Sequence, residues 1–194
     1  PAEFLRSHPT LTSVLEADAI PLLERIATEH GVCVNRGMTT SLPAISDPGK
    51  CICVGLNYKD HVAETNRSDS PFPALFVRFA DSLTGDGAKV MVPACSHMFD
   101  WEGELAVVIG RRGRSISKAD AWDHIAGYTC FNDITVRDWQ RHTIQWTPGK
   151  NFPGTGALGP WFVTRDEVPD IRQSTLETRV NGNVMQHAPI SSMI

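Results

Sequence analysis

From Cys51 onward, the chain is a succession of short apolar runs separated by turn residues, and this alternation constrains its fold more than any other feature. Runs of about 4–8 residues rich in Val, Ile and Phe are typical of β-strands. Asn181-Gly182 is a dipeptide that favours a two-residue hairpin turn. The pattern predicts a mainly β (α+β) fold, with strands in residues 51–56, 74–79, 89–93, 104–110, 125–131, 159–164 and 176–180.

The N-terminal part has a different character, because residues 1–31 form the only clearly helical region. Asp18 is placed to cap a helix, since its side chain can accept a hydrogen bond from a free backbone N–H of the first turn. Gly31 can end that helix. The apolar side chains expected to face inward are Ile20, Leu22, Leu23 and Ile26.

Residues 41–50 contain two prolines and a glycine, which is typical of a linker or a boundary. We therefore divide the chain into an N-terminal appendage and linker at residues 1–50 and a core at residues 51–194. Two short helices are expected to interrupt the strands of the core, at residues 57–66 and 117–125. No internal repeat is visible.

Composition excludes several classes of protein. Hydrophobic residues make up 41% of the 194 residues and charged residues 21%, so the chain is expected to fold rather than to be disordered. The net charge of −4 gives no drive toward nucleic acid or an anionic membrane. The apolar runs are too short to cross a bilayer. The five cysteines form no C-x-x-C pair, so we expect no disulfide framework and a cytoplasmic location.

Three carboxylates open one predicted strand. In Asp100-Trp101-Glu102-Gly103-Glu104, alternate side chains point to one face, so the three carboxylates share it. Both faces turn apolar further along, so we expect this strand to be buried on both sides. Clustered carboxylates in such a place repel one another unless a cation lies among them, and oxygen ligands suit Mg²⁺, Mn²⁺ or Ca²⁺. The alternative is a solvated strand end.

A possible acid–base pair follows the first strand run. If the segment after residue 57 is helical, His61 and Glu64 stand three residues apart and can touch. A carboxylate beside an imidazole orients it and raises its basicity, as general-base catalysis requires. The alternative is a surface helix with an incidental pair.

A second polar group follows the run at residues 125–131. Asp133 lies at the expected strand end, with Arg137 and Gln140 about one helical turn later, and such a segment can serve a metal and an anionic ligand together. Lys150, in a Gly- and Pro-rich stretch, can anchor a ligand carboxylate. The alternatives are a helix N-terminus near Asp133 and a plain loop around Lys150.

Taken in chain order, these segments resemble the fumarylacetoacetate hydrolase family. The resemblance covers the chain from about Ile52 to Ile194. It is carried by the segments "CVGLNYKDHVAE", "PALFVRF", "DWEGELAVVIGR", "IAGYTCFNDITVRDWQ", "GKNFPGTGALGPWFVT" and "VNGNVMQ".

The resemblance implies a mixed β-sandwich roll with short helices, assembled as a homodimer. It also implies a divalent cation, Mg²⁺ or Mn²⁺, with Ca²⁺ possible in a crystal. The implied metal ligands are Glu102, Glu104 and Asp133. The implied catalytic pair is His61 and Glu64. The implied substrate-binding positions are Tyr58, Arg137, Gln140 and Lys150.

Family substrates are small 2-oxo or β-diketo acids, so the resemblance first suggests a metal-dependent hydrolase that cleaves a C–C bond in an acylpyruvate-like or fumarylacetoacetate-like acid. An oxaloacetate-type decarboxylase, or an isomerase or hydratase, is the alternative on the same site. A non-catalytic binding protein on this fold is a second alternative. The family pattern continues beyond the point matching Ile194, so we expect the core to be truncated at its C-terminus.

Overall fold

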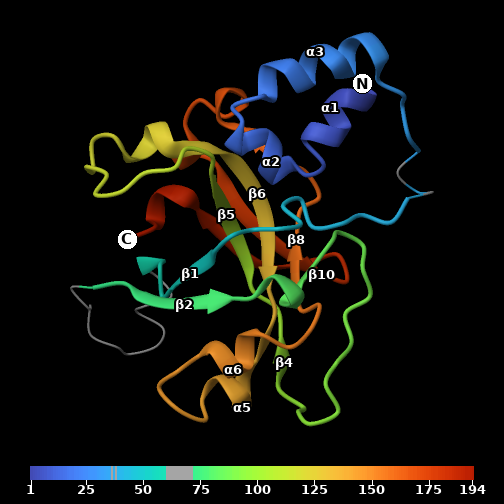
Figure 1. The fold of residues 1–194 in the computed structure, drawn as a ribbon. Helices are drawn as coiled ribbons and strands as arrows, with labels where there is room; N and C mark the ends of the chain where they lie inside the picture. The colour runs from blue at the N-terminus through green and yellow to red at the C-terminus, as the bar shows by residue number, and fades with distance from the viewer. Residues whose placement is uncertain (36, 38, 60–71) are drawn as a thin grey trace.

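A computed structural model of the chain describes residues 1–35, 37, 39–59 and 72–194. Its centre is a mixed sheet in the order β3-β8-β6-β5, in which β3 and β8 are parallel and the other pairs antiparallel, and β9 also pairs with β6. The long, curved β5 and β6 run side by side through the molecule (Figure 1). The strands of this sheet are β3 (Leu83–Thr84), β5 (Gly103–Ile109), β6 (Ile125–Asp133), β8 (Gly156–Leu158) and β9 (Val163–Thr164).

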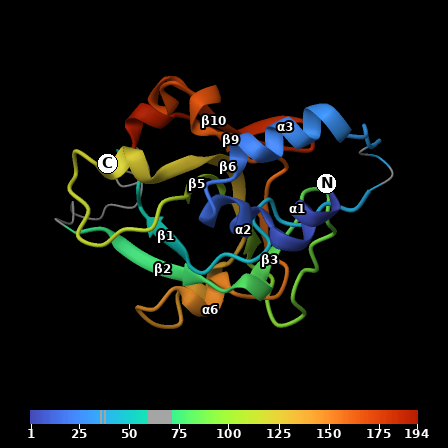
Figure 2. The same ribbon diagram turned by 45° about the horizontal axis from the view of Figure 1, so that its top comes forward.

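Three two-stranded antiparallel pairs surround this sheet. The pairs are β1 (Cys51–Gly55) with β2 (Ala74–Arg78), β4 (Phe99–Asp100) with β7 (Thr135–Val136), and β10 (Thr175–Val180) with β11 (Asn183–Pro189). The β1–β2 pair and the β10–β11 pair lie on opposite sides of β5 and β6 (Figure 2).

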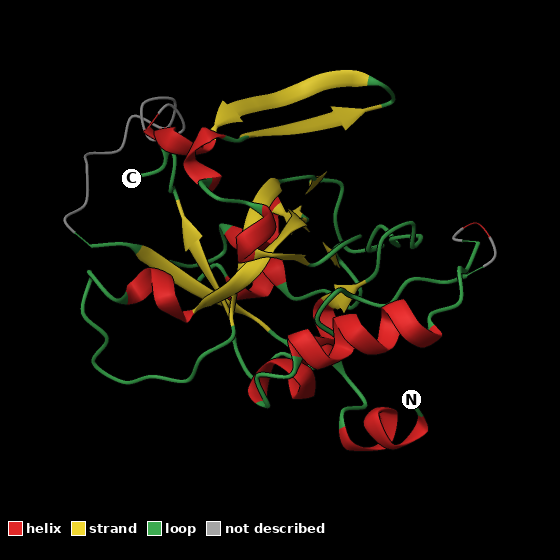
Figure 3. Cartoon of the chain, turned by 90° about the horizontal axis from the view of Figure 1, so that it is seen from above, coloured by secondary structure: helices red, strands yellow, loops and turns green. Residues whose placement is uncertain are grey.

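The β10–β11 hairpin confirms the turn predicted from the sequence. Val180 pairs with Asn183, so Asn181 and Gly182 form a two-residue loop, and both have positive φ angles, 51° and 83°. Such a turn matches the right-handed twist of paired strands. The hairpin extends as a two-stranded ribbon along one side of the molecule (Figure 3).

Three helices precede the strands: α1 (Ala2–Ser7), α2 (Leu11–Glu16) and α3 (Ile20–His30). They enclose a small apolar cluster of Phe4, Val14 and Ala19. Two details of the prediction for this region are wrong. Ala19, not Asp18, is the N-cap of α3, because Asp18 lies in a left-handed turn with φ of 52°. Leu22 is exposed rather than inward-facing.

The other helical segments in the described residues are short. Residues 117–125 form only one 3₁₀ turn, η3, rather than the predicted helix, and residues 89–93 form no strand. Most of the helix predicted at 57–66 lies outside the described residues. The short elements are η2 (Ala80–Ser82), η3 (Ala121–His124), α5 (Arg137–Gln140), α6 (Thr147–Lys150), η4 (Arg165–Glu167), η5 (Ile171–Gln173) and η6 (Ile190–Ser192).

The main apolar core lies on one face of the central sheet. It is formed by Ile45, Leu83, Phe131 and Leu158, with Ala106 and Val108 of β5 packed against it. The opposite face of β5 leaves Val107 and Ile109 exposed, so the expected burial of this strand on both sides is wrong. No helix in the described part of the chain is long and apolar enough to cross a membrane. The mainly β fold with short helices is confirmed.

Candidate functional site

The pairing of β5 with β6 brings two of the predicted metal ligands together. Asp133 is the last residue of β6, and its backbone N–H donates to the carbonyl of Glu102, the residue before β5, at 2.8 Å. The Glu102 backbone N–H in turn donates to Oδ1 of Asn132 at 3.1 Å. Because the register is fixed at this point, the two carboxylates are held on neighbouring strands.

Lys150 bridges these two carboxylates. Its Nζ donates to Glu102 Oε2 at 2.6 Å and to Asp133 Oδ2 at 2.7 Å, and its side chain is only 2% exposed. Lys150 is the last residue of α6, a helix packed closely on α5. Gly149 permits this approach, since a Cβ there would lie 2.4 Å from the backbone nitrogen of Gln140. The predicted ligand-anchoring lysine is therefore buried between two acidic side chains.

Arg137 approaches Glu102 from the other side. At the start of α5, it forms an ion pair with Oε1 of Glu102, and its Nε donates to Asp100 Oδ2 at 2.8 Å. It also donates to Oε1 of Gln140 at 3.3 Å. Arg137 and Gln140 thus stand beside Glu102 as predicted neighbours of the site, and Asp100 contributes by pairing with Arg137.

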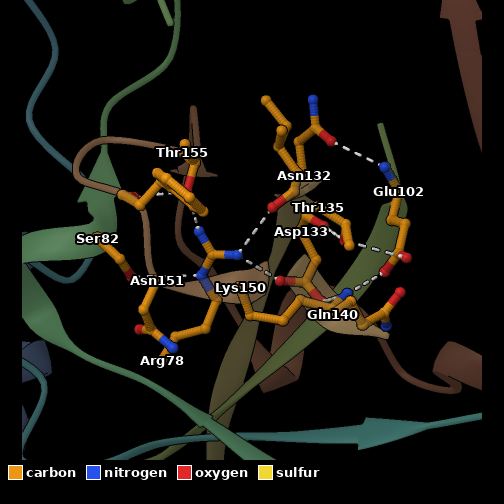
Figure 4. Close-up of polar contacts among 12 residues, drawn as sticks. Arg78, Ser82, Glu102, Asn132, Asp133, Thr135, Gln140, Lys150, Asn151 and Thr155 are labelled. Atoms are coloured by element: carbon orange, nitrogen blue, oxygen red, sulfur yellow. Dashed lines mark hydrogen bonds and ion pairs between the residues drawn. The ribbon is translucent and has the colours of Figure 1, made fainter. Parts of the chain in front are cut away.

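Arg78 is a site residue that the sequence analysis missed. The side chain is fully buried at the end of β2, and Nη1 donates to Asp133 Oδ1 at 2.7 Å (Figure 4). One signal was available: Arg78 follows Ala74 and Phe76 at alternate positions of a strand, on the face that points inward. A charged residue at such a position is almost never buried unless it is paired.

These contacts form an alternating chain of charges. Its order is Arg78, Asp133, Lys150, Glu102, Arg137 and Asp100. Every member is hydrogen-bonded to its neighbour, which is the condition under which charges are tolerated in a protein interior. Thr135 adds a hydrogen bond to Glu102 Oε1 at 3.2 Å.

Glu104 stands outside this chain of charges. Within the described part of the protein it has no hydrogen-bond or ion-pair partner. Burial, together with the nearby charges of Glu102 and Asp133, raises its pKa from 4.5 to about 7. The Tyr58 hydroxyl is buried and has no hydrogen-bond partner among the described residues, and burial, followed by the charge of Glu104, raises its pKa. The site therefore holds one carboxylate whose charge the described cations do not balance.

The paired carboxylates differ in their response to the same surroundings. Burial alone would raise the pKa of Glu102, but Lys150 and Arg137 together lower it below the ordinary value. Burial raises the pKa of Asp133, although Lys150 and Arg78 oppose the shift. Proton affinity at this site is thus set by desolvation acting against ion pairing.

We tested whether these residues fit the divalent cation that the resemblance implies. Among the described residues, no three His, Cys, Asp or Glu side chains form a ready-made metal cage. The donor chemistry does fit: three carboxylates supply the oxygen ligands that Mg²⁺ and Mn²⁺ prefer. The raised pKa of Glu104 also reflects negative charge that a cation would neutralise.

The predicted pair His61 and Glu64 lies outside the described residues. Tyr58, which precedes the pair, is described and forms an isolated antiparallel β-bridge with Met193. The carbonyl of Asn57 accepts a hydrogen bond from the N–H of Ile194 at 3.0 Å. The pair therefore remains a prediction.

The chain matches a known protein family and several of its members. The family model for the C-terminal domain of fumarylacetoacetate (FAA) hydrolases matches residues 50–194. Oxaloacetate tautomerase FAHD2A, mitochondrial, from Bos taurus is 42% identical to the chain over 194 residues, which cover 99% of the chain and 59% of that relative. The chain spans 51–60% of the length of this relative and of its counterparts from Xenopus laevis and Homo sapiens.

Solved structures show the same fold. A putative HpcE protein from Mycobacterium smegmatis superposes with a TM-score of 0.84 at 31% identity, over 99% of this chain and 68% of that one. A 5-carboxymethyl-2-hydroxymuconate delta-isomerase from the same organism superposes with a TM-score of 0.69 at 35% identity, over 79% of this chain and 60% of that one. The first of these superpositions extends over nearly the whole chain.

Proposed function

Because the chain belongs to the fumarylacetoacetate hydrolase family, we propose that its site moves a proton within a small 2-oxo acid, as a cation-dependent tautomerase or isomerase. The observation that carries this proposal is the chain of alternating charges, whose buried middle members lie near an unbalanced carboxylate, Glu104. Such an arrangement is suited to binding a cation and an anionic oxygen-rich ligand in one place.

The names of similar proteins support this reaction class over hydrolysis, which the sequence analysis put first. The bovine relative is named as an oxaloacetate tautomerase, and one structural neighbour as a delta-isomerase. Both names describe relocation of a proton and a double bond in an acid, without loss of a carbon fragment. C–C hydrolysis, which the name of the family model favours, and decarboxylation are the second candidates.

Glu102, Glu104 and Asp133 are the residues that would hold a divalent cation in this proposal. When bound, such a cation supplies electrostatic stabilisation of the negative charge that develops on substrate oxygens. Mg²⁺ and Mn²⁺ are the ions we propose, because all three ligands are carboxylates.

The other residues act through their own charge and hydrogen bonds. Arg137 carries a planar donor group that can hold a substrate carboxylate in two-point contact, and Gln140 lies within its reach. The hydroxyl of Tyr58, which has no partner among the described residues, can donate to a substrate oxygen. His61, oriented by Glu64, is the predicted proton carrier.

Two further expectations concern the setting of the protein. The homodimer implied by the resemblance remains a prediction, which light scattering of the purified protein checks. The similar vertebrate proteins are named as mitochondrial, so a mitochondrial location is the alternative to the cytoplasmic one expected from the cysteines.

The deciding experiment offers the purified protein a panel of oxaloacetate and acylpyruvates with and without Mn²⁺. Keto–enol exchange is followed by ultraviolet absorbance and by NMR in deuterated water, and products are identified. We expect Mn²⁺-dependent exchange of oxaloacetate that Glu102→Gln abolishes and the exposed control Glu177→Gln retains. Release of an acyl acid or of CO₂ as the main outcome would replace this proposal with hydrolysis or decarboxylation.

A further inference from the structure

We infer that Arg78 is a positioning residue, which fixes the plane of the Asp133 carboxylate so that one oxygen is held toward the site. The inference rests on the proposed function for its catalytic meaning, although the contacts that carry it do not depend on that function. Neither the resemblance nor the compared proteins' names assign a role to Arg78.

The guanidinium of Arg78 uses all three nitrogens in separate contacts. Nη1 donates to Asp133 Oδ1 at 2.7 Å and to the carbonyl of Ile134 at 3.2 Å. Nη2 donates to Thr155 Oγ1 at 2.8 Å, and Nε donates to Ser82 Oγ at 3.3 Å. With four acceptors around it, the side chain has one orientation in which all its contacts are made.

The two hydroxyl groups are themselves held in place. Ser82 Oγ donates its hydrogen to the carbonyl of Phe79 at 2.7 Å, and Thr155 Oγ1 donates to the carbonyl of Phe152 at 2.7 Å. Since each hydroxyl has only one hydrogen, both must act as acceptors toward Arg78. The surroundings of residue 78 are therefore arranged for a cation with several diverging donors.

Packing leaves little room for the guanidinium to move. A Cβ on Gly156 would lie 2.9 Å from both Nε and Nη2 of Arg78, and the ring of Phe131 lies 5.5 Å from the guanidinium carbon. Ser82 and Thr155 are almost completely buried, as is Arg78 itself. Movement of the guanidinium away from these neighbours would break its hydrogen bonds.

This rigidity has a consequence for Asp133. Because Arg78 occupies Oδ1, the other oxygen, Oδ2, is directed to Lys150 and toward the Glu102 side of the site. Without the guanidinium, only Lys150 would hold the carboxylate, and its plane could turn about the terminal torsion, which is a soft degree of freedom. A residue that orients a metal-binding carboxylate in this way typically changes metal affinity about 10–100-fold when it is lost.

The test compares Arg78→Gln, Arg78→Lys and Thr155→Val with the wild-type protein. The Kd for Mn²⁺ is measured by calorimetry, kcat and KM on oxaloacetate by absorbance, and the melting temperature by circular dichroism. We expect Arg78→Gln to raise the Kd for Mn²⁺ about 10–100-fold. Arg78→Lys should recover part of this loss, because it restores the charge but not the contacts to Ser82 and Thr155. Thr155→Val should give a smaller rise in the same direction.

Arg165→Gln is the matched control, because Arg165 is exposed and pairs with another exposed residue, Asp123, which is not a member of the chain of charges. We expect its Kd, kcat and KM to be those of the wild type. If Arg78→Gln does not fold, Thr155→Val still decides the question, since it changes shape little and charge not at all.

Two results would overturn the inference. One is a Kd for Mn²⁺ unchanged in both Arg78→Lys and Thr155→Val while only the melting temperature falls, which is the outcome of a purely structural role. The other is a crystal structure of either variant in which the Asp133 carboxylate keeps its orientation. Failure of the proposed function gives a different result: wild-type protein that binds Mn²⁺ but turns over no 2-oxo acid, or binds none, while the crystal structures still report on Asp133.

Discussion

The N-terminal helices and the site beside the central sheet bury opposite kinds of side chain. The helices α1 to α3 enclose Phe4, Val14 and Ala19, an apolar cluster without charges. In the sheet region, four of the five largest fully buried side chains are polar: Lys150, Thr135, Thr155 and Ser82, with Val136 as the exception. The first region is stabilised by apolar surface removed from water, and the second by completed hydrogen bonds and ion pairs.

The two regions should respond differently to substitution. Apolar packing loses free energy roughly in proportion to the surface and volume removed. A buried ion pair responds differently, since removal of one partner leaves the other charged and desolvated. Substitutions of similar size should therefore lower the free energy of unfolding more at the site than among the helices. Four substitutions test this contrast.

Lys150→Met should give the largest loss. The variant keeps the length of the side chain but leaves the facing oxygens of Glu102 and Asp133 without their common cation. We expect the free energy of unfolding at pH 7 to fall by about 3–5 kcal/mol, as measured by urea denaturation. A loss below about 1 kcal/mol would show that the two carboxylates are adequately served by Arg137 and Arg78 alone.

Glu104→Gln should change the pH dependence of stability. The folded chain raises the pKa of Glu104 from 4.5 to about 7, so between these values the folded state binds more protons than the unfolded state. The free energy of unfolding of the wild type therefore falls as pH rises through this window, by up to about 3 kcal/mol at pH 8. The glutamine variant should lack that loss.

The measurement is the difference in unfolding free energy between Glu104→Gln and wild type at pH 5 and at pH 8, in buffer containing a chelator. We expect little difference at pH 5 and a more stable variant at pH 8. Addition of Mg²⁺ at pH 8 should stabilise the wild type more than the variant if Glu104 is a ligand. A difference that does not vary with pH would show that the Glu104 carboxyl titrates normally.

Val14→Ala tests the apolar side of the contrast. Val14 is almost fully buried among the N-terminal helices, and removal of two methyl groups should cost about 2 kcal/mol. The Kd for Mn²⁺ should be that of the wild type, because no contact links Val14 to the carboxylates. A change in metal affinity comparable to that of Arg78→Gln would mean that the helices and the site are coupled.

Arg165→Gln should give the smallest effect. Its ion pair with Asp123, at 3.2 Å, lies between two exposed side chains, and such pairs contribute less than about 1 kcal/mol. Thermal unfolding in low and high salt measures this contribution. A loss as large as that of Lys150→Met would contradict the view that burial, rather than pairing itself, makes the charges of the site costly to disturb.

Much of the fold follows from local signals in the sequence. The apolar runs predict β1, β2, β5, β6 and β10 with small errors at their ends. The Asn181-Gly182 turn is correct because a two-residue loop with positive φ leaves few alternatives. The strand predicted at residues 89–93 is wrong, since apolar residues without a neighbouring strand to pair with remain irregular.

The site was predictable only in part. The structure brings Glu102, Asp133, Arg137, Gln140 and Lys150 together, and their roles in binding a metal or a substrate stay predictions. Arg78 was overlooked because a single basic residue at a strand end is usually solvent-exposed, and its burial depends on Asp133, Ser82 and Thr155, which come from distant parts of the chain. Burial of both faces of β5 was wrongly expected, because apolar composition alone does not say what covers a face.

The kinds of element, the hairpin turn and the set of acidic and basic residues near strand ends follow from the sequence alone. They do so because backbone preferences and side-chain alternation act over a few residues. Which charge pairs with which, and that Glu104 is the carboxylate left without a described partner, depends on the three-dimensional fold. Pairing depends on strand register and burial, which join residues as far apart as Arg78 and Thr155, and no local pattern encodes the free energy of taking those charges out of water.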